Sequence, residues 1–471
     1  MIDEKKVYSL IKSGDIEFVD LKFTDIRGTW QHFTMTARGF DPEANERGYG
    51  FDGSSIKGFQ EIYDSDMLLI PDMSTAFLDP FYEKTLSVIC DIYDPITKKP
   101  FEKDPRYTAR KAEKYLKKTG IGDTSYWGPE LEFFLFESTA VRLTPYESGI
   151  SLRSSELPNQ DGYEYEDEEF YRLQTKGGYF PVPPFDKFQD FRSEATTILE
   201  SIGVEIEVHH HEVATGGQCE IDMRFDSLLK MADKVMKYKY VIRNLAKQYG
   251  MTAIFLPKPV YGDNGSGMHT HQSIFKDGKN IFFDAKGKYA ELSKEALNYT
   301  AGLLTHLYAV LGITNSTLNS YRRLVPHFEA PTVVAFSARN RSAAIRIPMY
   351  HPGVEKAKRL ELRCPDPTTN PYLSFAAQLM AGMDGIEKKM DPTKMGYGPF
   401  DENIWEKHNG IKQTPHDLFT ALNALEACDI MTKGNVFNKD LIVSYLDIKR
   451  TEATEALMYP TPADFMINGD L

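Results

Sequence analysis

The stretch WGPELEFFLFE, residues 127–137, decides how the rest of the chain is interpreted. Its aromatic and leucine content, bounded by Gly-Pro, predicts a buried strand. Residues two apart on a strand share a face, so Glu130 and Glu132 point to one side while Leu131 and Phe133 face the other. Two carboxylates side by side in an apolar strand repel each other and lose hydration, which favours a divalent metal over them. Taken alone, the pair is better explained by a solvated sheet edge or a pairing arginine, and it is the matching groups in four later segments that favour the metal.

Length and composition fit a globular protein with more than one domain. The chain has 471 residues, of which 41% are hydrophobic and 12% aromatic, enough for a large core. Its net charge of -13 opposes broad attraction to nucleic acid or anionic membrane, so we expect neither as a direct partner. The four cysteines are isolated, and no apolar run of about 18 residues is present. These features predict a cytoplasmic protein.

Residues 1–103 form the first predicted domain, which is rich in β-structure. A helix over residues 4–13 opens it, and two alternating runs around residues 25–28 predict a hairpin. The segment GYGFDGSSIKGF, residues 48–59, matches the G-x-G-x-x-G spacing of dinucleotide-binding proteins, but no strand-helix-strand unit surrounds it. We therefore expect a flexible loop that presents Asp52.

Residues 104–471 form the second predicted domain. Asp104 as cap, Pro105 in the first turn and Gly120 after the last turn delimit its first helix. An irregular region is expected over residues 144–178, where the acidic run YEYEDEEF is typical of a solvated loop. Strands are expected over residues 86–95 in the first domain and 204–213, 218–225, 267–275 and 359–364 in the second, and helices over 227–249, 291–311 and 371–389.

Acidic and histidine side chains from several predicted strands converge on one site. Glu212 and Glu220 lie on either side of the turn in VEIEVHHHEVATGGQCEIDMRF. The triplet HHH in the same stretch resembles a zinc tract, but its members alternate faces on a strand, and we do not expect it to form a ligand cluster. Alternation along a strand also groups Glu130 with Glu132, His269 with His271 and Ser273, and Glu361 with Arg363.

The candidate metal ligands in these groups are carboxylates and one imidazole. Oxygen-dominated ligation suits Mg²⁺ or Mn²⁺ better than zinc, which would favour more histidine or cysteine. The ligands exceed what one Mg²⁺ needs if it also keeps waters and substrate. The sequence therefore predicts two or more divalent ions per subunit.

Arginines are dense near these acidic residues in the chain. Mg²⁺ together with arginine stabilises phosphoryl transfer, so the combination predicts a polyanionic substrate. No G-x-x-x-x-G-K-[ST] segment exists, which means that a nucleotide would be held by metals and arginines without a P-loop. The arginines are Arg322, Arg323, Arg339, Arg341, Arg346 and Arg363.

Seven motifs in order along the chain resemble those of bacterial type I glutamine synthetase over nearly the whole length. They are FDGSS, GPELEFF, HHHEVATGGQCEI, DNGSGMHTHQS, RRLVPHFEAP, SARNRSAAIRIP and ELRCPDPTTNPYL. The resemblance implies an α+β fold, with an N-terminal β-grasp domain and a large catalytic α/β domain whose antiparallel sheet forms an active-site funnel. It also implies two stacked hexameric rings of identical subunits, with each active site between neighbours, and synthesis of L-glutamine from L-glutamate, ammonium and ATP through γ-glutamyl phosphate.

The resemblance assigns roles residue by residue. One metal would be held by Glu132, Glu212 and Glu220, and the other by Glu130, His269 and Glu361. ATP would be bound by Glu207, His271, Ser273, Arg346 and Lys356, with Arg341 at the transferring phosphate. Glutamate would be bound by Asn264, Gly265, Arg323 and Arg363, together with Glu329 and Arg341. The resemblance makes Asp52, from an adjacent subunit, the base that deprotonates ammonium, and Glu329 the acid-base group on a closing loop.

Three features depart from the family pattern. Trp405 stands where many relatives carry a tyrosine that is adenylylated, and an indole has no hydroxyl to modify, so we expect this control to be absent. His327 and Phe328 replace the usual Gly-Tyr before Glu329, which predicts altered loop mobility. The polar ending NGDL replaces an apolar tail, which weakens the case for ring pairing.

Three other functions are compatible with parts of this pattern. A γ-glutamyl-polyamine ligase of the same fold would be expected to lack the ammonium-binding aspartate, whereas Asp52 stands in an intact DGSS. An inactive structural oligomer would be expected to lack metal ligands, yet all six candidates are present. A carboxylate-rich cation store leaves the arginine cluster unexplained.

Overall fold

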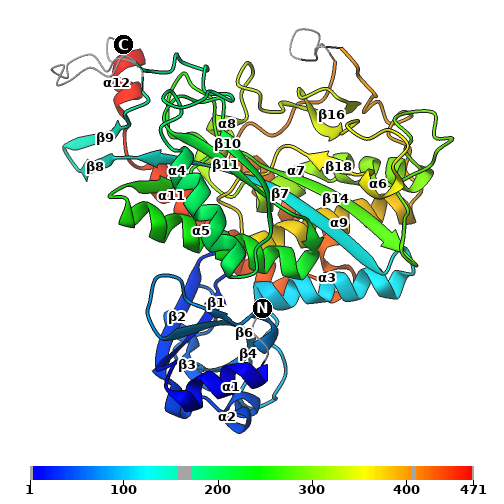
Figure 1. Ribbon diagram of the computed structural model, residues 1–471. Helices are drawn as coiled ribbons and strands as arrows, with labels where there is room; N and C mark the ends of the chain where they lie inside the picture. The colour runs from blue at the N-terminus through cyan, green and yellow to red at the C-terminus, as the bar shows by residue number, and fades with distance from the viewer. Residues whose placement is uncertain (1–3, 158–170, 403, 405–409, 469–471) are drawn as a thin grey trace.

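The computed structural model describes residues 4–157, 171–402, 404 and 410–468. Trp405 and the acidic run YEYEDEEF lie outside these described residues. Figure 1 shows two parts, a small N-terminal sheet domain and a larger domain built on a broad sheet with helices against it. The predicted α+β architecture is confirmed.

The N-terminal domain is a six-stranded sheet in the order β2-β1-β6-β4-β3, with β5 beside β6. Strands β1 and β6 run parallel, and the other pairs are antiparallel. Leu21, Leu69 and Val88 are fully buried between the sheet and α1, whose Val7 is also buried. The elements are α1 Glu4–Ser13, β1 Phe18–Thr24, β2 Trp30–Thr36, α2 Pro42–Arg47, β3 Tyr49–Asp52, β4 Asp66–Pro71, β5 Phe77–Leu78 and β6 Thr85–Tyr93.

The expected opening helix, hairpin and closing strand are confirmed, but the loop expected at residues 48–59 is partly wrong. Tyr49–Asp52 forms strand β3 paired with β4, because Tyr49 and Phe51 alternate toward the core while the glycine between them leaves the other face open. A short turn of helix, Gly53–Ser55, follows it. Asp52 therefore sits at the end of an edge strand.

The larger domain is built on a ten-stranded sheet, mostly antiparallel, in the order β10-β11-β7-β14-β18-β17-β16. Strands β12 and β13 also pair with β7, and β15 pairs with β14. Only β16 and β17 are parallel to each other. The strands are β7 Thr124–Phe136, β10 Ile206–His211, β11 Gln218–Met223, β12 Asp226–Ser227, β13 Thr252–Ile254, β14 Met268–Lys276, β15 Lys279–Asn280, β16 Val333–Ala338, β17 Ala343–Ile347 and β18 Leu360–Leu362.

One face of this sheet is covered by helices (Figure 1). Leu131, Phe133 and Leu135 are completely buried, as their alternation along β7 predicts. The rings of Trp127 and Phe375 stack with centroids 5.1 Å apart. The helices are α3 Pro105–Thr119, α4 Gln189–Ser201, α5 Leu228–Gln248, α6 Lys294–Thr305, α7 Leu307–Thr314, α8 Leu318–Arg323, α9 Pro371–Glu387, α10 Leu418–Glu426, α11 Lys439–Leu457 and α12 Pro462–Asn468.

Two expectations for this domain need correction. The helix predicted over residues 291–311 is two helices, because Ser293 caps a later start and the chain breaks at His306, whose ring bonds to Asp384. The start of the region expected to be irregular, residues 144–178, instead contains strand β9 Glu147–Arg153, which forms a hairpin with the preceding strand β8 Ser138–Thr144. Its residues are mostly exposed, although Val141 and Leu143, and Ile150 and Leu152, alternate with polar residues as strands do.

Buried polar contacts join the two domains. Arg106 at the start of α3 forms ion pairs with Asp72 and Asp91 of the first domain and with Asp233 on α5. The side-chain amide of Asn370, which caps α9, donates to the Asp25 carbonyl at 3.1 Å. These contacts fix the N-terminal sheet against the helical layer.

Within the described residues, no single helix combines the length and apolar composition needed to cross a membrane. Helices α6 and α7 meet that test only together, as a pair bent by 72°.

Candidate active site

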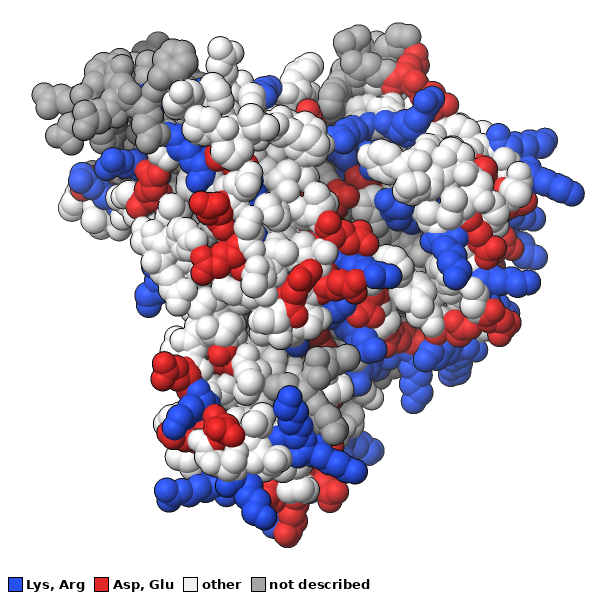
Figure 2. Space-filling view, viewed as in Figure 1, with Lys and Arg blue, Asp and Glu red and all other residues white. Residues whose placement is uncertain are grey.

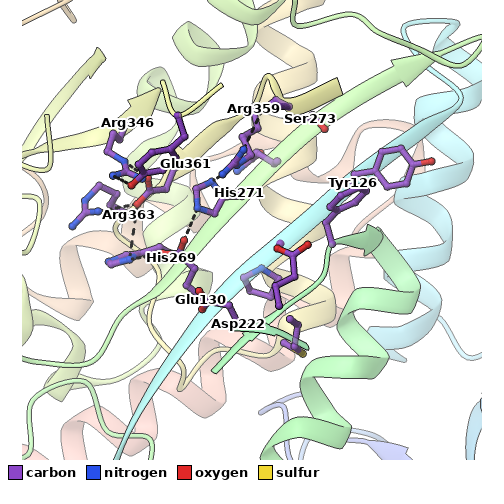
Figure 3. Close-up of a pocket in the computed structure, with 18 of the residues that line it drawn as sticks. Tyr126, Glu130, Asp222, His269, His271, Ser273, Arg346, Arg359, Glu361 and Arg363 are labelled. Atoms are coloured by element: carbon purple, nitrogen blue, oxygen red, sulfur yellow. Dashed lines mark hydrogen bonds and ion pairs between the residues drawn. The ribbon is translucent and has the colours of Figure 1, made fainter. Parts of the chain in front are cut away.

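A cavity of about 610 Å³ opens on the sheet face opposite the helices, over β7, β14 and β18. Figure 2 shows acidic and basic side chains interspersed across the middle of the larger domain. In Figure 3, Glu130 on β7 and His269 and His271 on β14 lie on the same side of the sheet as Glu361. The register explains this, since His269 pairs with Glu130 across the two strands.

The first group of candidate metal ligands is Glu130, His269 and Glu361. One ligand atom of each lies within 4.8 Å of the others. His269 Nδ1 is 3.3 Å from one Glu130 oxygen, and His271 Nε2 is 2.7 Å from the other. Burial opposes ionisation of Glu130, but these two histidines hold its pKa well below the usual range. Burial, with Arg363 nearby, lowers the pKa of His269 to about 4, so the ring is neutral and able to bind a metal.

The second group is Glu132, Glu212 and Glu220, again with ligand atoms within 4.8 Å of one another. Glu220 on β11 pairs directly with Glu132 on β7. Burial and the neighbouring carboxylates raise the pKa of Glu220 well above its usual range, and burial raises that of Glu212 to about 7. A divalent cation would offset this concentration of negative charge, so the donor set fits a hard metal ion. The amide of Gln218 donates to Glu132 at 2.9 Å and orients it.

Arginines surround the first group. Arg346 Nε and Arg363 Nη1 both donate to Glu361, the second at 2.8 Å. Burial opposes ionisation of Glu361, but Arg363 and His271 lower its pKa. Arg359 Nε donates to His271 Nδ1 at 3.2 Å and so fixes that ring. The carboxylate is held ionised among cations that also face the cavity.

A second, smaller cavity of about 30 Å³ adjoins the second group. Arg323 is anchored there by donating from Nη1 to the Cys364 carbonyl at 2.9 Å. Arg341 lines both the small and the large cavity, and so connects them. The residues around the small cavity include Glu132, Glu212, Asn264, Gly265, Arg323, Glu329, Arg341 and Arg363.

The loop that carries Glu329 closes over this small cavity. His327 and Glu329 have left-handed φ values of 72° and 58°. The ring of Phe328 lies between two ammonium groups, with Lys176 Nζ 4.1 Å and Lys258 Nζ 3.9 Å from its centroid. The Phe328 ring therefore helps to hold this loop in place.

The large cavity contains the residues expected to bind a nucleotide. Glu207, Ser273, Arg346 and Lys356 all line it. Tyr126 contacts Phe225 and Phe275 edge-on, at centroid distances of 5.3 and 5.0 Å, which gives the cavity an aromatic wall. A flat base can bind against such a surface.

Asp52 does not join these residues within a single chain. It is fully exposed on the N-terminal sheet, where hydrogen bonds from Ser54 and Ser55 lower its pKa. Its carboxylate is ionised and accessible to another molecule.

Several cavity residues were missed by sequence reasoning. His210 lies 3.8 Å from Glu220 and, with Asp222, completes a third group of potential ligands. His211 instead pairs with buried Glu156, and His209 contacts Arg192, so the triplet does split between faces as expected. The sequence did indicate His210, because it lies two residues before Glu212 and side chains two apart on a strand share a face. Tyr179 and Arg359 also line the cavity, and no motif marked them.

The fold and the site define a two-domain protein with carboxylate groups that could hold metal ions beside a cavity lined by arginines. Residues 15–95 match the family model "Glutamine synthetase, beta-Grasp domain", and residues 102–467 match "Glutamine synthetase, catalytic domain". The chain belongs to the glutamine synthetase family, a family of glutamate–ammonia ligases.

Individual relatives match the chain over nearly their full lengths, and one of them is named for a different activity. The chain is 49% identical to a glutamine synthetase of Azorhizobium caulinodans over 468 residues, covering 98% of both chains. It is 47% identical to a protein of Cupriavidus pinatubonensis named 3-hydroxylaminophenol mutase, covering 98% of this chain and 97% of that one. A cryo-electron microscopy structure of Plasmodium falciparum glutamine synthetase superposes with a TM-score of 0.89 at 28% identity, covering 99% of both chains.

Proposed function

We propose that the chain joins ammonia to the γ-carboxylate of L-glutamate, converting ATP to ADP and phosphate through γ-glutamyl phosphate, and so serves nitrogen assimilation. Family membership supports the overall reaction. The observation that carries the proposal is that Arg341 lines both cavities. One guanidinium can then contact the phosphoryl group as it passes from a nucleotide in the large cavity to an acceptor in the small one.

Two divalent ions, Mg²⁺ or Mn²⁺, fit the two carboxylate groups. Glu132, Glu212 and Glu220 would hold one, and Glu130, His269 and Glu361 the other. When bound, such ions neutralise charge on the transferring phosphoryl group. The arginines that already contact Glu361 set the orientation of that carboxylate.

The remaining side chains bind and orient the substrates. Glu207, His271, Ser273, Arg346 and Lys356 bind ATP in the large cavity, whose aromatic wall suits the base. Asn264, Gly265, Arg323 and Arg363, with Glu329 and Arg341, bind glutamate in the small one.

The reaction proceeds in two steps. An oxygen of the γ-carboxylate attacks the γ-phosphorus of ATP, and the bond to the bridging oxygen breaks to release ADP. Asp52 from a neighbouring copy takes a proton from ammonium, and the ammonia attacks the acyl carbon. Phosphate leaves as the adduct collapses, and Glu329 accepts the remaining proton. The closed loop excludes water from the acyl phosphate.

The exposed position of Asp52 supports an assembly in which each site is shared between copies, two stacked hexameric rings in the family's arrangement. We also propose that the domain boundary lies between residues 103 and 104 and that the protein is cytoplasmic. Because Trp405 has no hydroxyl, we propose that the activity of the protein is not controlled by adenylylation.

Oxygen transfer from glutamate to phosphate tests the proposed intermediate. With glutamate labelled with ¹⁸O in the γ-carboxylate, each phosphate released should carry one labelled oxygen, because the attacking oxygen stays on phosphorus. Mass spectrometry of the phosphate measures this. Unlabelled phosphate during active turnover would exclude γ-glutamyl phosphate.

A further inference from the structure

Hydrogen bonds of the Asn340 side chain hold in place the short link that contains Arg341. This link, residues 339–342, connects the parallel strands β16 and β17. Arg339 within it has a left-handed φ of 60°. Arg341 follows two residues later, and its position depends on how this non-regular backbone is held.

Asn340 uses both ends of its amide for this purpose. Its Oδ1 accepts hydrogen bonds from the Ser342 backbone N at 3.0 Å and from Ser342 Oγ at 2.7 Å. Its Nδ2 donates to the carbonyls of Phe400 at 3.0 Å and Glu402 at 2.7 Å. An asparagine amide offers two donors and two acceptor lone pairs, so every one is used. Asn340 therefore bonds at the same time to Ser342, which follows Arg341 in the chain, and to the backbone of Phe400 and Glu402.

Residues 400–402, to which Asn340 donates its hydrogen bonds, are themselves hydrogen-bonded to the sheet and to the residues beside it. Phe400 N donates to the Phe336 carbonyl at 3.2 Å, on strand β16. Asp401 accepts hydrogen bonds from Ser337 Oγ at 2.6 Å and from the Tyr289 hydroxyl at 2.5 Å. The Tyr289 hydroxyl accepts in turn from the Ala338 backbone N at 2.6 Å. Residues 400–402 are therefore a fixed support and not a free loop end.

We infer that Asn340 is a positioning residue, which holds the Arg341 guanidinium at the junction of the two cavities by anchoring its backbone to residues 400–402. Asn340 contacts no substrate site itself, since it lines neither cavity of the active site and faces the separate cavity behind the link. The inference rests on the proposed role of Arg341 in phosphoryl transfer.

Substitution Asn340→Asp isolates this role. The change keeps the Oδ1 acceptor for Ser342 but puts a carboxylate oxygen against the carbonyls of Phe400 and Glu402, so only the anchoring half is lost. We expect kcat for glutamate-dependent phosphate release to fall about 10- to 100-fold, as displacement by about 1 Å does in other sites. The KM for ATP should stay within about twofold, because the residues assigned to the rest of the nucleotide, Glu207, His271, Ser273, Arg346 and Lys356, are unchanged. Asn244→Asp on α5 carries the same charge change away from the site and should leave kcat unchanged.

A double-mutant cycle with Arg341→Ala shows whether Asn340 acts through Arg341. In the Arg341→Ala background, Asn340→Asp should lower the residual kcat by less than about twofold. An equal loss in both backgrounds, or full kcat in the single Asn340→Asp variant, would overturn the inference. If Asn340→Asp fails to fold, Asn340→Ser, which removes both amide donors without adding charge, is measured by the same criteria. Wild-type protein without glutamate-dependent phosphate release would instead overturn the proposed function, and the inference with it.

Discussion

Arg363 Nη1 donates a hydrogen bond to Glu361 Oε1 at 2.8 Å, from two residues further along the chain. The same guanidinium donates from Nε to the Arg341 carbonyl at 3.1 Å and from Nη2 to the Glu329 carbonyl at 3.3 Å. One side chain thus joins a candidate metal ligand, the arginine at the cavity junction and the closing loop. A single planar fork can do this, whereas a lysine ammonium cannot.

Arg363→Lys should therefore impair catalysis while keeping the charge. We expect kcat/KM for glutamate to fall about 10- to 100-fold, the effect of losing one charged hydrogen bond of about 1.5–3 kcal/mol. ADP binding, measured by calorimetry, should change little, because Arg363 lines the large cavity but is not among the residues assigned to the nucleotide. Arg224→Lys, an exposed arginine paired with Glu205, is the matched control. Loss of ADP binding in parallel with activity would contradict this division of roles.

Glu132→Gln should weaken one metal site and spare the other. The substitution removes a negative charge from the group that includes Glu212 and Glu220, and we expect Mn²⁺ affinity at that site to fall by about 10-fold or more. Titration followed by electron paramagnetic resonance counts the sites. Glu205→Gln, at an exposed position, should bind as wild type does. Two sites of unchanged affinity in Glu132→Gln would remove it from the ligand set.

Asp52→Asn should separate the two proposed steps. Transfer of ¹⁸O from glutamate to phosphate should persist, because Asp52 is proposed to act on ammonium and not on the phosphoryl group, while glutamine formation falls about 100-fold or more because the base is missing. Mixed oligomers of Asp52→Asn and Arg341→Ala subunits should regain part of the activity, since some shared sites contain both native residues. If mixing restores nothing, Asp52 does not act across subunits.

The stability of the chain should depend on pH through Asp384. Burial opposes its ionisation, but Lys433, Lys388 and His306 hold its pKa at about 2, against about 3.9 when unfolded. Between these values the unfolded state binds more protons, so this stabilisation is full above about pH 5 and is lost as pH falls toward 2. Because the lysines are partly exposed, we expect Asp384→Asn to lower the free energy of unfolding by about 1–2 kcal/mol at pH 7. The difference should shrink to about half by pH 3, as measured by urea unfolding, and a pH-independent difference would contradict this origin.

The alternating pattern around Glu130, together with the matching groups in later segments, was sufficient to predict the centre of the site. Strand period alone separated Glu130 and Glu132 from Leu131 and Phe133, and the structure agrees. The two groups of ligands follow from this, because strand register then brings Glu220 to Glu132 and His269 to Glu130. The alternation of side chains along each strand and the register between strands together determine where most of the candidate metal ligands lie.

Other parts depend on contacts that sequence period does not encode. Arg359 reaches the site only because β18 begins beside β14, next to His271, and Asn340 matters only because residues 400–402 return to strand β16. The hairpin β8–β9 was missed although Val141 and Leu143, and Ile150 and Leu152, alternate with polar residues. The catalytic role of Asp52 was indicated by the resemblance alone, because its exposed turn is typical of an ordinary loop.

The most direct measurement is phosphate release from the purified protein with Mg-ATP and glutamate, with ammonium present, absent or replaced by putrescine. The account predicts strong turnover that requires ammonium and yields glutamine in equal amount to phosphate. Turnover with putrescine alone would assign the chain to polyamine ligation, and no turnover under any condition would contradict its catalytic function.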